Sequence, residues 1–214
     1  MIYALNEVEA TSRKAARGAG FAWGLAEEIG KAVRVLAAHG LPGPELLLAH
    51  LRASDRQAYD DWAPLAIEGT WQARGGLLCP LIAGITLCDH HQQLTQDKGF
   101  SLGPTAFPLL VVPFVLRAAA DRPLLLKWQG VEIHCAAGRL AVAGKSDDLR
   151  SPRAEGLTCT IGPGPQSGET PSRHGREIDQ EVWRALERFA HRTYVPASEA
   201  SRLAGAGAGT SDND

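Results

Sequence analysis

Apolar residues between positions 25 and 37 recur at steps of three and four, the spacing that gathers them on one side of an α-helix. The stripe consists of Leu25, Ala26, Ile29, Ala32, Val33, Leu36 and Ala37. Glu27 and Lys31 stand four residues apart, in the order that favours an ion pair on the solvent-facing side. His39-Gly40, followed by Pro42, predicts the end of this helix.

Other helical segments are predicted on either side of this one. Asn6 and Glu9 have the spacing of a capping box, so a shorter helix is expected from Asn6 to about Arg17, ending at Gly18. Its inward face would be made mostly of small side chains, which suit close packing against another helix. Residues 44–50 begin with proline and predict a third helix, and the more polar residues 52–62 predict a fourth.

Two later segments, Leu77–Leu87 and Phe107–Leu116, are apolar along their whole length. We expect both to be buried strands, with a buried helix as the alternative for either, because a continuous apolar run has no period to read. Proline at 108 and 113 and the shortness of both runs argue against membrane spans.

The strongest β pattern lies between residues 123 and 144. Leu124–Trp128, Val131–Ala136 and Arg139–Ala143 are separated by Gln129-Gly130 and Ala137-Gly138. Short glycine-containing breaks between apolar runs predict an antiparallel meander. Residues 157–161 would add one more strand.

The order of helices, then strands, then a helix predicts an α+β fold. We expect one domain with a helical part (1–64), a β-rich part (65–161), a flexible Gly/Pro-rich loop (162–175), and a C-terminal helix with a Gly/Ala-rich tail (176–214). The last helix would cover 179–192.

Composition narrows the class of protein. The chain is 44% hydrophobic and 21% charged, with a net charge of -2, and these values are ordinary for a globular protein. The sequence has no long basic run, which disfavours a nucleic-acid partner. It also has no secretory signal pattern and no membrane-spanning segment. Its four cysteines have no short paired spacing and predict reduced thiols. A cytoplasmic protein is therefore expected.

Residues 16–28, "ARGAGFAWGLAEE", contain glycines at 18, 20 and 24. They are not a dinucleotide fingerprint, because the third glycine comes one position late and a charged helix precedes them instead of a buried strand. An anion could still bind at the start of the second helix, with Arg17 supplying charge. The simpler alternative is a joint between two helices in which Trp23 fills the core.

A second cluster, Cys88-Asp89-His90-His91, contains residue types that bind metals or activate a thiol. His134-Cys135 could contribute from elsewhere, but a strand directs these two side chains to opposite faces. No pair has the spacing of a zinc site, so no metal ligands are assigned, and Cys79, Cys135 and Cys159 are expected to be small buried apolar residues.

Near the C-terminus, Arg173 and His174 stand on the Gly/Pro-rich loop, and Tyr194, Ser198 and Arg202 lie in the tail. Arg173 and Arg176, on either side of His174, could close over an anionic substrate, and a solvated linker is the alternative.

Together the two ends, "NEVEATSRKAARGAGFAWGLAEEIGKAVRVLAAHG" at 6–40 and "RTYVPASEASRLAGAGAGTSDND" at 192–214, resemble a proteobacterial domain family of unknown function over the full length of the chain. The resemblance implies a bacterial cytoplasmic protein. It assigns no activity, cofactor or residue role.

The hypothesis that follows is an enzyme, or a subunit of one, acting on a small anionic metabolite. The residues expected to bind substrate are Arg17, Trp23, Arg173, Tyr194, Ser198 and Arg202. His90 or His174 would be the general acid or base, and Glu27 either a base or an exposed ion-pair partner. A non-catalytic ligand-binding or assembly subunit, as a homo-oligomer or with a partner, is the first alternative. A metal-dependent hydrolase built on residues 88–91 is the second.

Overall fold

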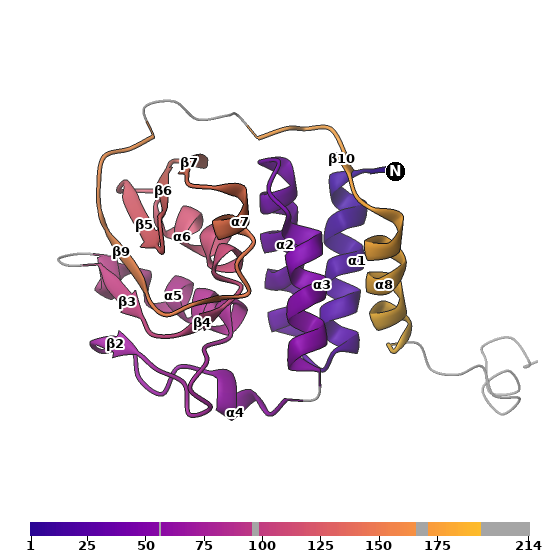
Figure 1. Cartoon of the computed structure of the whole chain (residues 1–214), viewed down its shortest axis with the longest axis horizontal. Coiled ribbons are helices and arrows are strands. Elements are labelled where there is room, and N and C mark those ends of the chain that lie inside the picture. Colours follow the sequence, from indigo (N-terminus) through magenta and orange to yellow (C-terminus); the bar gives the residue numbers. More distant parts are fainter. Residues whose placement is uncertain (56, 96–98, 166–170, 194–214) are drawn as a thin grey trace, which may run out of the picture.

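The computed structural model describes residues 1–55, 57–95, 99–165 and 171–193. These form an α+β fold, as the order of the segments predicted. Four helices stand side by side, and a mixed sheet lies apart from them (Figure 1). The space between is occupied by α5 (Pro80–Thr95), the 3-10 helix η1 (Pro108–Val111) and α6 (Val112–Ala118), which contact α2, while α6 also contacts the strands.

The helical layer consists of α1 (Leu5–Gly18), α2 (Trp23–Ala38), α3 (Gly43–Ser54) and α8 (Gln180–His191). Helix α1 packs against both α2 and α8, so the first and last described helices are neighbours (Figure 1). Small side chains permit this approach. Ala15 and Ala16 are fully buried, and Gly18 lies directly against the carbonyl of Phe189, where a Cβ atom would collide with the backbone.

The main sheet has the order β2 (Thr70–Trp71), β3 (Phe100–Leu102), β9 (Leu157–Ile161), β5 (Leu124–Trp128), β6 (Val131–Ala136) and β7 (Arg139–Ala143). Only the β2–β3 pair is parallel among the described strands. The predicted meander and its added strand are confirmed at these bounds. Burial alternates along β6, with Cys135 buried and His134 half-buried on the other face.

Short elements complete the described chain. β1 (Ile2–Tyr3) pairs with β10 (Arg176–Glu177), and β4 (Thr105–Ala106) pairs with β8 (Arg153–Ala154). Single turns form α4 (Tyr59–Trp62) and α7 (Ser146–Leu149). None of the helices in the described ranges is both long enough and apolar enough to cross a membrane.

The two apolar runs predicted as strands are helical, so that prediction was wrong. Leu77–Leu87 enters α5 at Pro80, and Phe107–Leu116 forms η1 and α6. Both segments are buried on nearly all sides, and a helix surrounded by protein has no polar stripe to show its period. A signal was present, because prolines at 80, 108 and 113 each lie in a first helical turn, where no backbone N–H is required.

Smaller corrections concern helix ends and ion pairs. Helix α1 begins one residue earlier than expected, and Glu7, not Glu9, accepts a hydrogen bond from the backbone N–H of Ala4 at 2.7 Å. Lys31 pairs with Glu28 at 2.7 Å in place of Glu27. The predicted third helix continues to Ser54, and the expected fourth is reduced to the single turn of α4.

Candidate functional site

The glycine-containing stretch between α1 and α2 is a tight joint whose geometry is set by its own backbone hydrogen bonds. The N–H of Gly20 bonds to the carbonyl of Arg17 at 3.0 Å, and the N–H of Phe21 bonds to that of Ala16 at 3.2 Å. Gly20 has φ +109°, a conformation that glycine adopts without a Cβ penalty. This turn ends α1 and directs the ring of Phe21 away from the helix axis.

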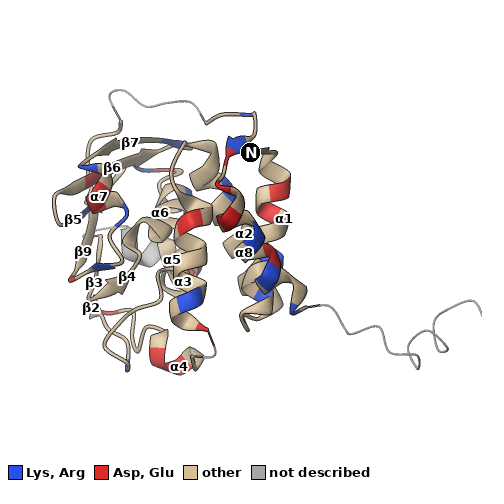
Figure 2. Ribbon diagram, turned by 45° about the vertical axis from the view of Figure 1, so that its right-hand side comes forward, with Lys and Arg blue, Asp and Glu red and all other residues tan. Residues whose placement is uncertain are grey.

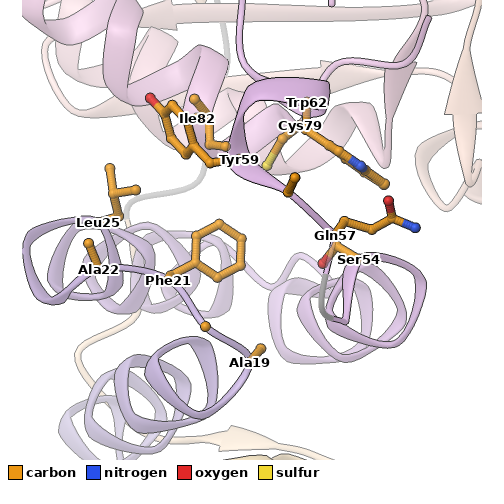
Figure 3. A pocket seen from close by; sticks show the side chains of 12 residues that line it. Ala19, Phe21, Ala22, Leu25, Ser54, Gln57, Tyr59, Trp62, Cys79 and Ile82 are labelled. Atoms are coloured by element: carbon orange, nitrogen blue, oxygen red, sulfur yellow. The ribbon is translucent and has the colours of Figure 1, made fainter. Parts of the chain in front are cut away.

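Phe21 is one wall of a pocket of about 460 Å³ (Figure 3). The other walls come from the end of α3, from α4 and from the start of α5, which supply Ser54, Tyr59, Trp62 and Ile82 among others. Three aromatic rings and several aliphatic side chains dominate the lining, with a few hydroxyl and amide groups. Pockets of this size and composition are typical of small-molecule sites.

The sulfur of Cys79 belongs to this lining and sits near Tyr59 and Trp62 in Figure 3. Behind it, the Nε2 atom of His50 lies 3.2 Å from Cys79 Sγ. His50 is fully buried and is surrounded by the rings of Phe21, Trp62 and Phe107, with centroids 5.6 to 6.4 Å away.

Burial controls the ionisation of this pair. Loss of water around the imidazole lowers the pKa of His50 to about 3. Burial also raises the pKa of the Cys79 thiol to about 12, although the backbone N–H groups of Ile82 and Leu81 act in the opposite direction. At neutral pH the resting pair is therefore a neutral thiol and a neutral imidazole.

The charged residues next to the pocket lining in the sequence include two acidic ones, whereas the hypothesis of an anionic substrate requires cations. Asp60 and Asp61 lie on α4, between the lining residues Tyr59 and Trp62, and appear as a red turn in Figure 2. Arg17 stands two residues before the lining residue Ala19, and its Nη1 donates to the carbonyl of Phe21 at 3.1 Å. No Lys or Arg lines the pocket within the described residues. This lining suits an apolar ligand better than an anion.

Two of the predicted site residues are brought together at the joint. The guanidinium of Arg17 lies 5.5 Å from the ring centroid of Trp23, which is the geometry of a cation–π contact. Trp23 is the first residue of α2 and is 58% exposed, so the alternative in which it fills the core was wrong. Glu27 follows one turn later on the exposed side of α2.

The remaining predicted residues do not converge on this joint. Ser172 donates its backbone N–H to the carbonyl of Ala38 at 2.7 Å, so Arg173 and His174 lie near the far end of α2. A helix of 16 residues is roughly 24 Å long, which separates them from Trp23. Both are exposed.

His90 lies half-buried on α5, about three turns from Cys79. Residues 88–91 form part of a helix, and His91 Nδ1 lies 3.0 Å from the carbonyl oxygen of Cys88. Tyr194, Ser198 and Arg202 lie outside the described residues.

A separate charged cluster lies beside Cys88. Arg117 and Glu28 form an ion pair at 2.6 Å, and Glu28 also bonds Lys31. Burial raises the pKa of Cys88 to about 11, with Arg117 lowering it and the carboxylates of Glu28 and Asp89 raising it further. Within the described ranges, no three His, Cys, Asp or Glu side chains are grouped closely enough to hold a metal ion.

His50 and Cys79 were missed as functional candidates, although each had a signal in the sequence. His50 falls on the apolar stripe of α3, three and four residues after Leu47 and Leu46, which places it in the core. Cys79 immediately precedes Pro80, and proline in a first turn puts the preceding residue at a helix N-terminus. Because a strand was predicted for residues 77–87, Cys79 was not expected at a helix N-terminus.

Residues 3–79 match a family model described as "Protein of unknown function (DUF3726)". No curated protein and no solved structure matches the chain. The match covers about a third of the chain, whereas the resemblance noted from the sequence extended over its whole length. It contains His50 and every residue that lines the pocket except Ile82. The joint, the pocket and the buried pair therefore lie almost entirely in the part of the chain that matches this family model.

Proposed function

We infer that the chain binds a small organic molecule with a flat apolar body in the pocket between the α1–α2 joint, α3, α4 and α5. The observation that carries this proposal is the lining itself. Phe21, Tyr59 and Trp62 present three rings to a space of about 460 Å³, and Ser54 and Gln57 supply hydrogen-bonding groups among them. Aromatic walls gain free energy by covering a planar apolar surface, and the polar groups orient it.

The proposal keeps the small-molecule ligand expected from the sequence and changes its chemistry. An anionic metabolite would need a cation that is free to contact it, and Arg17 is engaged by the Phe21 carbonyl and the Trp23 ring. Asp60 and Asp61, on the same helical turn as the lining residues Tyr59 and Trp62, further disfavour an anion. The ligand class that fits is neutral and aromatic or alicyclic. The expected compartment remains the cytoplasm.

A thermal-shift screen tests the proposal with a library of small neutral aromatic and alicyclic compounds and matched carboxylic acids. Binding to the native state raises the melting temperature by mass action, so hits among the neutral compounds are expected to shift it by a few degrees at concentrations of about 100 Kd. The acids should give smaller shifts.

A matched pair of variants locates the binding. Ala22 lines the pocket and is exposed, so Ala22→Trp should fill the space without disturbing the core. Ala143 is also exposed but lies on strand β7 of the sheet, and Ala143→Trp serves as the control. Hits should be lost in Ala22→Trp and kept in Ala143→Trp. Equal shifts in both variants, or no hit in a broad library, would count against this pocket as the ligand site.

A further inference from the structure

The pocket has a reactive atom in its wall. Cys79 is one of the residues that line it, and His50 Nε2 lies 3.2 Å from the Cys79 sulfur. A thiol with an imidazole at hydrogen-bond distance and a ligand cavity beside it has the arrangement that thiol nucleophiles require.

Helix α5 provides a second contribution. Cys79 directly precedes this 16-residue helix, and the backbone N–H groups of Leu81 and Ile82 bond to its sulfur. The positive end of a helix stabilises a thiolate. The backbone of Cys79 is itself fixed, because its N–H donates to the carbonyl of Trp62 and its carbonyl accepts from Ala83, both at 3.0 Å. The sulfur is therefore held in one place.

Within the described residues, the imidazole of His50 has one polar contact, with the sulfur of Cys79. Three aromatic rings enclose it, Cys79 is the polar partner of Nε2, and Nδ1 is buried without a hydrogen-bond partner among the described residues. Burying an imidazole in an apolar cage with half of its hydrogen-bonding capacity unused costs free energy. A purely structural position would be filled more favourably by leucine or phenylalanine.

We propose that Cys79 is a nucleophile and His50 its general base, and that the pair accepts the acyl group of a small activated ester or thioester bound in the aromatic pocket. This inference rests on the proposed ligand site. In the reacting state the imidazole carries its own proton on Nδ1, so that Nε2 accepts the thiol proton.

The reaction balances without a cofactor. The sulfur attacks the carbonyl carbon and forms a C–S bond while its proton moves to His50 Nε2. The C–O or C–S bond to the leaving group then breaks, and His50 returns the proton to the departing alkoxide or thiolate. Water hydrolyses the resulting thioester at Cys79, releases the carboxylic acid, and restores the thiol.

The test uses the full chain and p-nitrophenyl acetate, a small aryl ester whose ring fits the pocket. Release of p-nitrophenol is followed in a stopped-flow instrument, and the acetylated residue is located by peptide mass spectrometry. The expected result is a burst of about one equivalent with the acetyl group on Cys79. Cys79→Ser should abolish the burst. Cys88→Ser, the matched change to a thiol outside the pocket, should leave it unchanged.

His50→Gln keeps a hydrogen-bonding group beside the sulfur but removes the base. The burst rate constant should fall about 100-fold or more, with Cys79 still the site of any acetylation. Circular dichroism and the melting temperature check that this variant folds.

A measurement on the wild-type protein does not depend on that variant. With neutral His50 as the base, the rate constant should change by less than about threefold between roughly pH 5 and pH 8, whereas a thiol reacting without a base gains about tenfold per pH unit below its pKa. The groups that face the pair are the rings of Phe21, Trp62 and Phe107, with the Tyr59 phenol in the same pocket and Asp60 and Asp61 at its edge.

The unreactive amide p-nitroacetanilide separates the two proposals. If it raises the melting temperature of the wild type and not of Ala22→Trp, while the ester acetylates lysines or Cys88 but not Cys79, the ligand site stands and the nucleophile is overturned. A rate constant that rises steadily with pH overturns the role of His50. If neither the amide nor the ester binds or reacts at the pocket, both proposals fail.

Discussion

Two thiols, Cys79 just before helix α5 and Cys88 within it, lie in very different environments. Cys79 faces a neutral imidazole and an aromatic pocket, and the groups in contact with its sulfur carry no charge. Cys88, nine residues later, lies beside Arg117 and Glu28, and its Sγ donates to the carbonyl of Phe114 at 3.7 Å. Burial and the N–H groups at the start of the helix set the pKa of Cys79. The pKa of Cys88 is set by burial together with the charges of Arg117, Glu28 and Asp89.

In this protein a nearby charge does not by itself make a cysteine a candidate nucleophile. Arg117 lowers the pKa of Cys88, yet Cys88 does not line the aromatic pocket. The pKa of Cys79 is raised further, but this residue has both a proton acceptor at hydrogen-bond distance and a cavity beside it. Three changes test this difference.

The largest effect is expected from removing the imidazole beside Cys79. His50→Ala leaves a cavity among three rings and deletes the partner of a buried thiol, so the free energy of unfolding should fall by about 2–4 kcal/mol. The matched change His91→Ala removes a half-buried imidazole near Cys88 and should cost less than about 1 kcal/mol. Urea unfolding of both variants measures the difference. Equal losses would show that His50 does not occupy a tightly packed position.

The next effect depends on pH. His50 has a pKa of about 3 in the folded chain and about 6.5 when unfolded, so only the unfolded chain takes up the proton between these values. Stability should therefore fall as the pH is lowered below about 6.5, by roughly 1 kcal/mol per pH unit, until about pH 3. Above pH 6.5 the imidazole is neutral in both states and contributes no slope.

His50→Gln provides the control for this pH dependence, because glutamine does not titrate. Urea unfolding of the variant between pH 6.5 and 4.5 should lose most of the slope seen in the wild type. Below about pH 4.5 Glu28 adds a contribution of the same direction, since its folded pKa is lowered by hydrogen bonds to Lys31 and Arg117 that outweigh the opposing effect of burial. An unchanged slope in His50→Gln would mean that another group controls acid stability.

The smallest effect concerns Cys88. Arg117→Gln removes a cation that lowers the pKa of this thiol, so alkylation of Cys88 by iodoacetamide at pH 8 should slow by several-fold, as followed by mass spectrometry. Alkylation of Cys79 should not change. Stability should fall by less than about 1 kcal/mol, because the Arg117–Glu28 pair is half-exposed and screened by water. Equal slowing at both thiols would indicate a global change of structure.

The local pattern of apolar and polar residues was sufficient to predict a helix or strand where that element has one buried face and one exposed face. The stripe of α2, the hairpins of 124–143 and the strand 157–161 were read correctly because solvent leaves a period in the sequence. The same reasoning failed for α5 and α6. The apolar run that begins α5 and the one that forms η1 and α6 are buried on nearly all sides, so neither has a polar stripe that would show its period.

The candidate site was predicted only in part, and for the same reason. The joint at residues 16–23 was recognised from its glycines, which are required by the turn, and Arg17 and Trp23 do meet there. The pairing of His50 with Cys79 was not predicted, because the two residues are 29 positions apart and only packing brings them together. Arg173 and His174 seemed suited to the same ligand by type, but β10 and the end of α2 hold them at the other end of the helix.

The sequence by itself determined the α+β order, the bounds of the meander, the joint after α1 and the apolar character of the core. Each of these follows from interactions between residues close in the chain. The tertiary structure alone decided that the apolar run after Cys79 is a helix, that the thiol just before it lies against His50, and that three rings line a pocket beside this thiol. Those features depend on burial and on contacts across the fold, which no local period records.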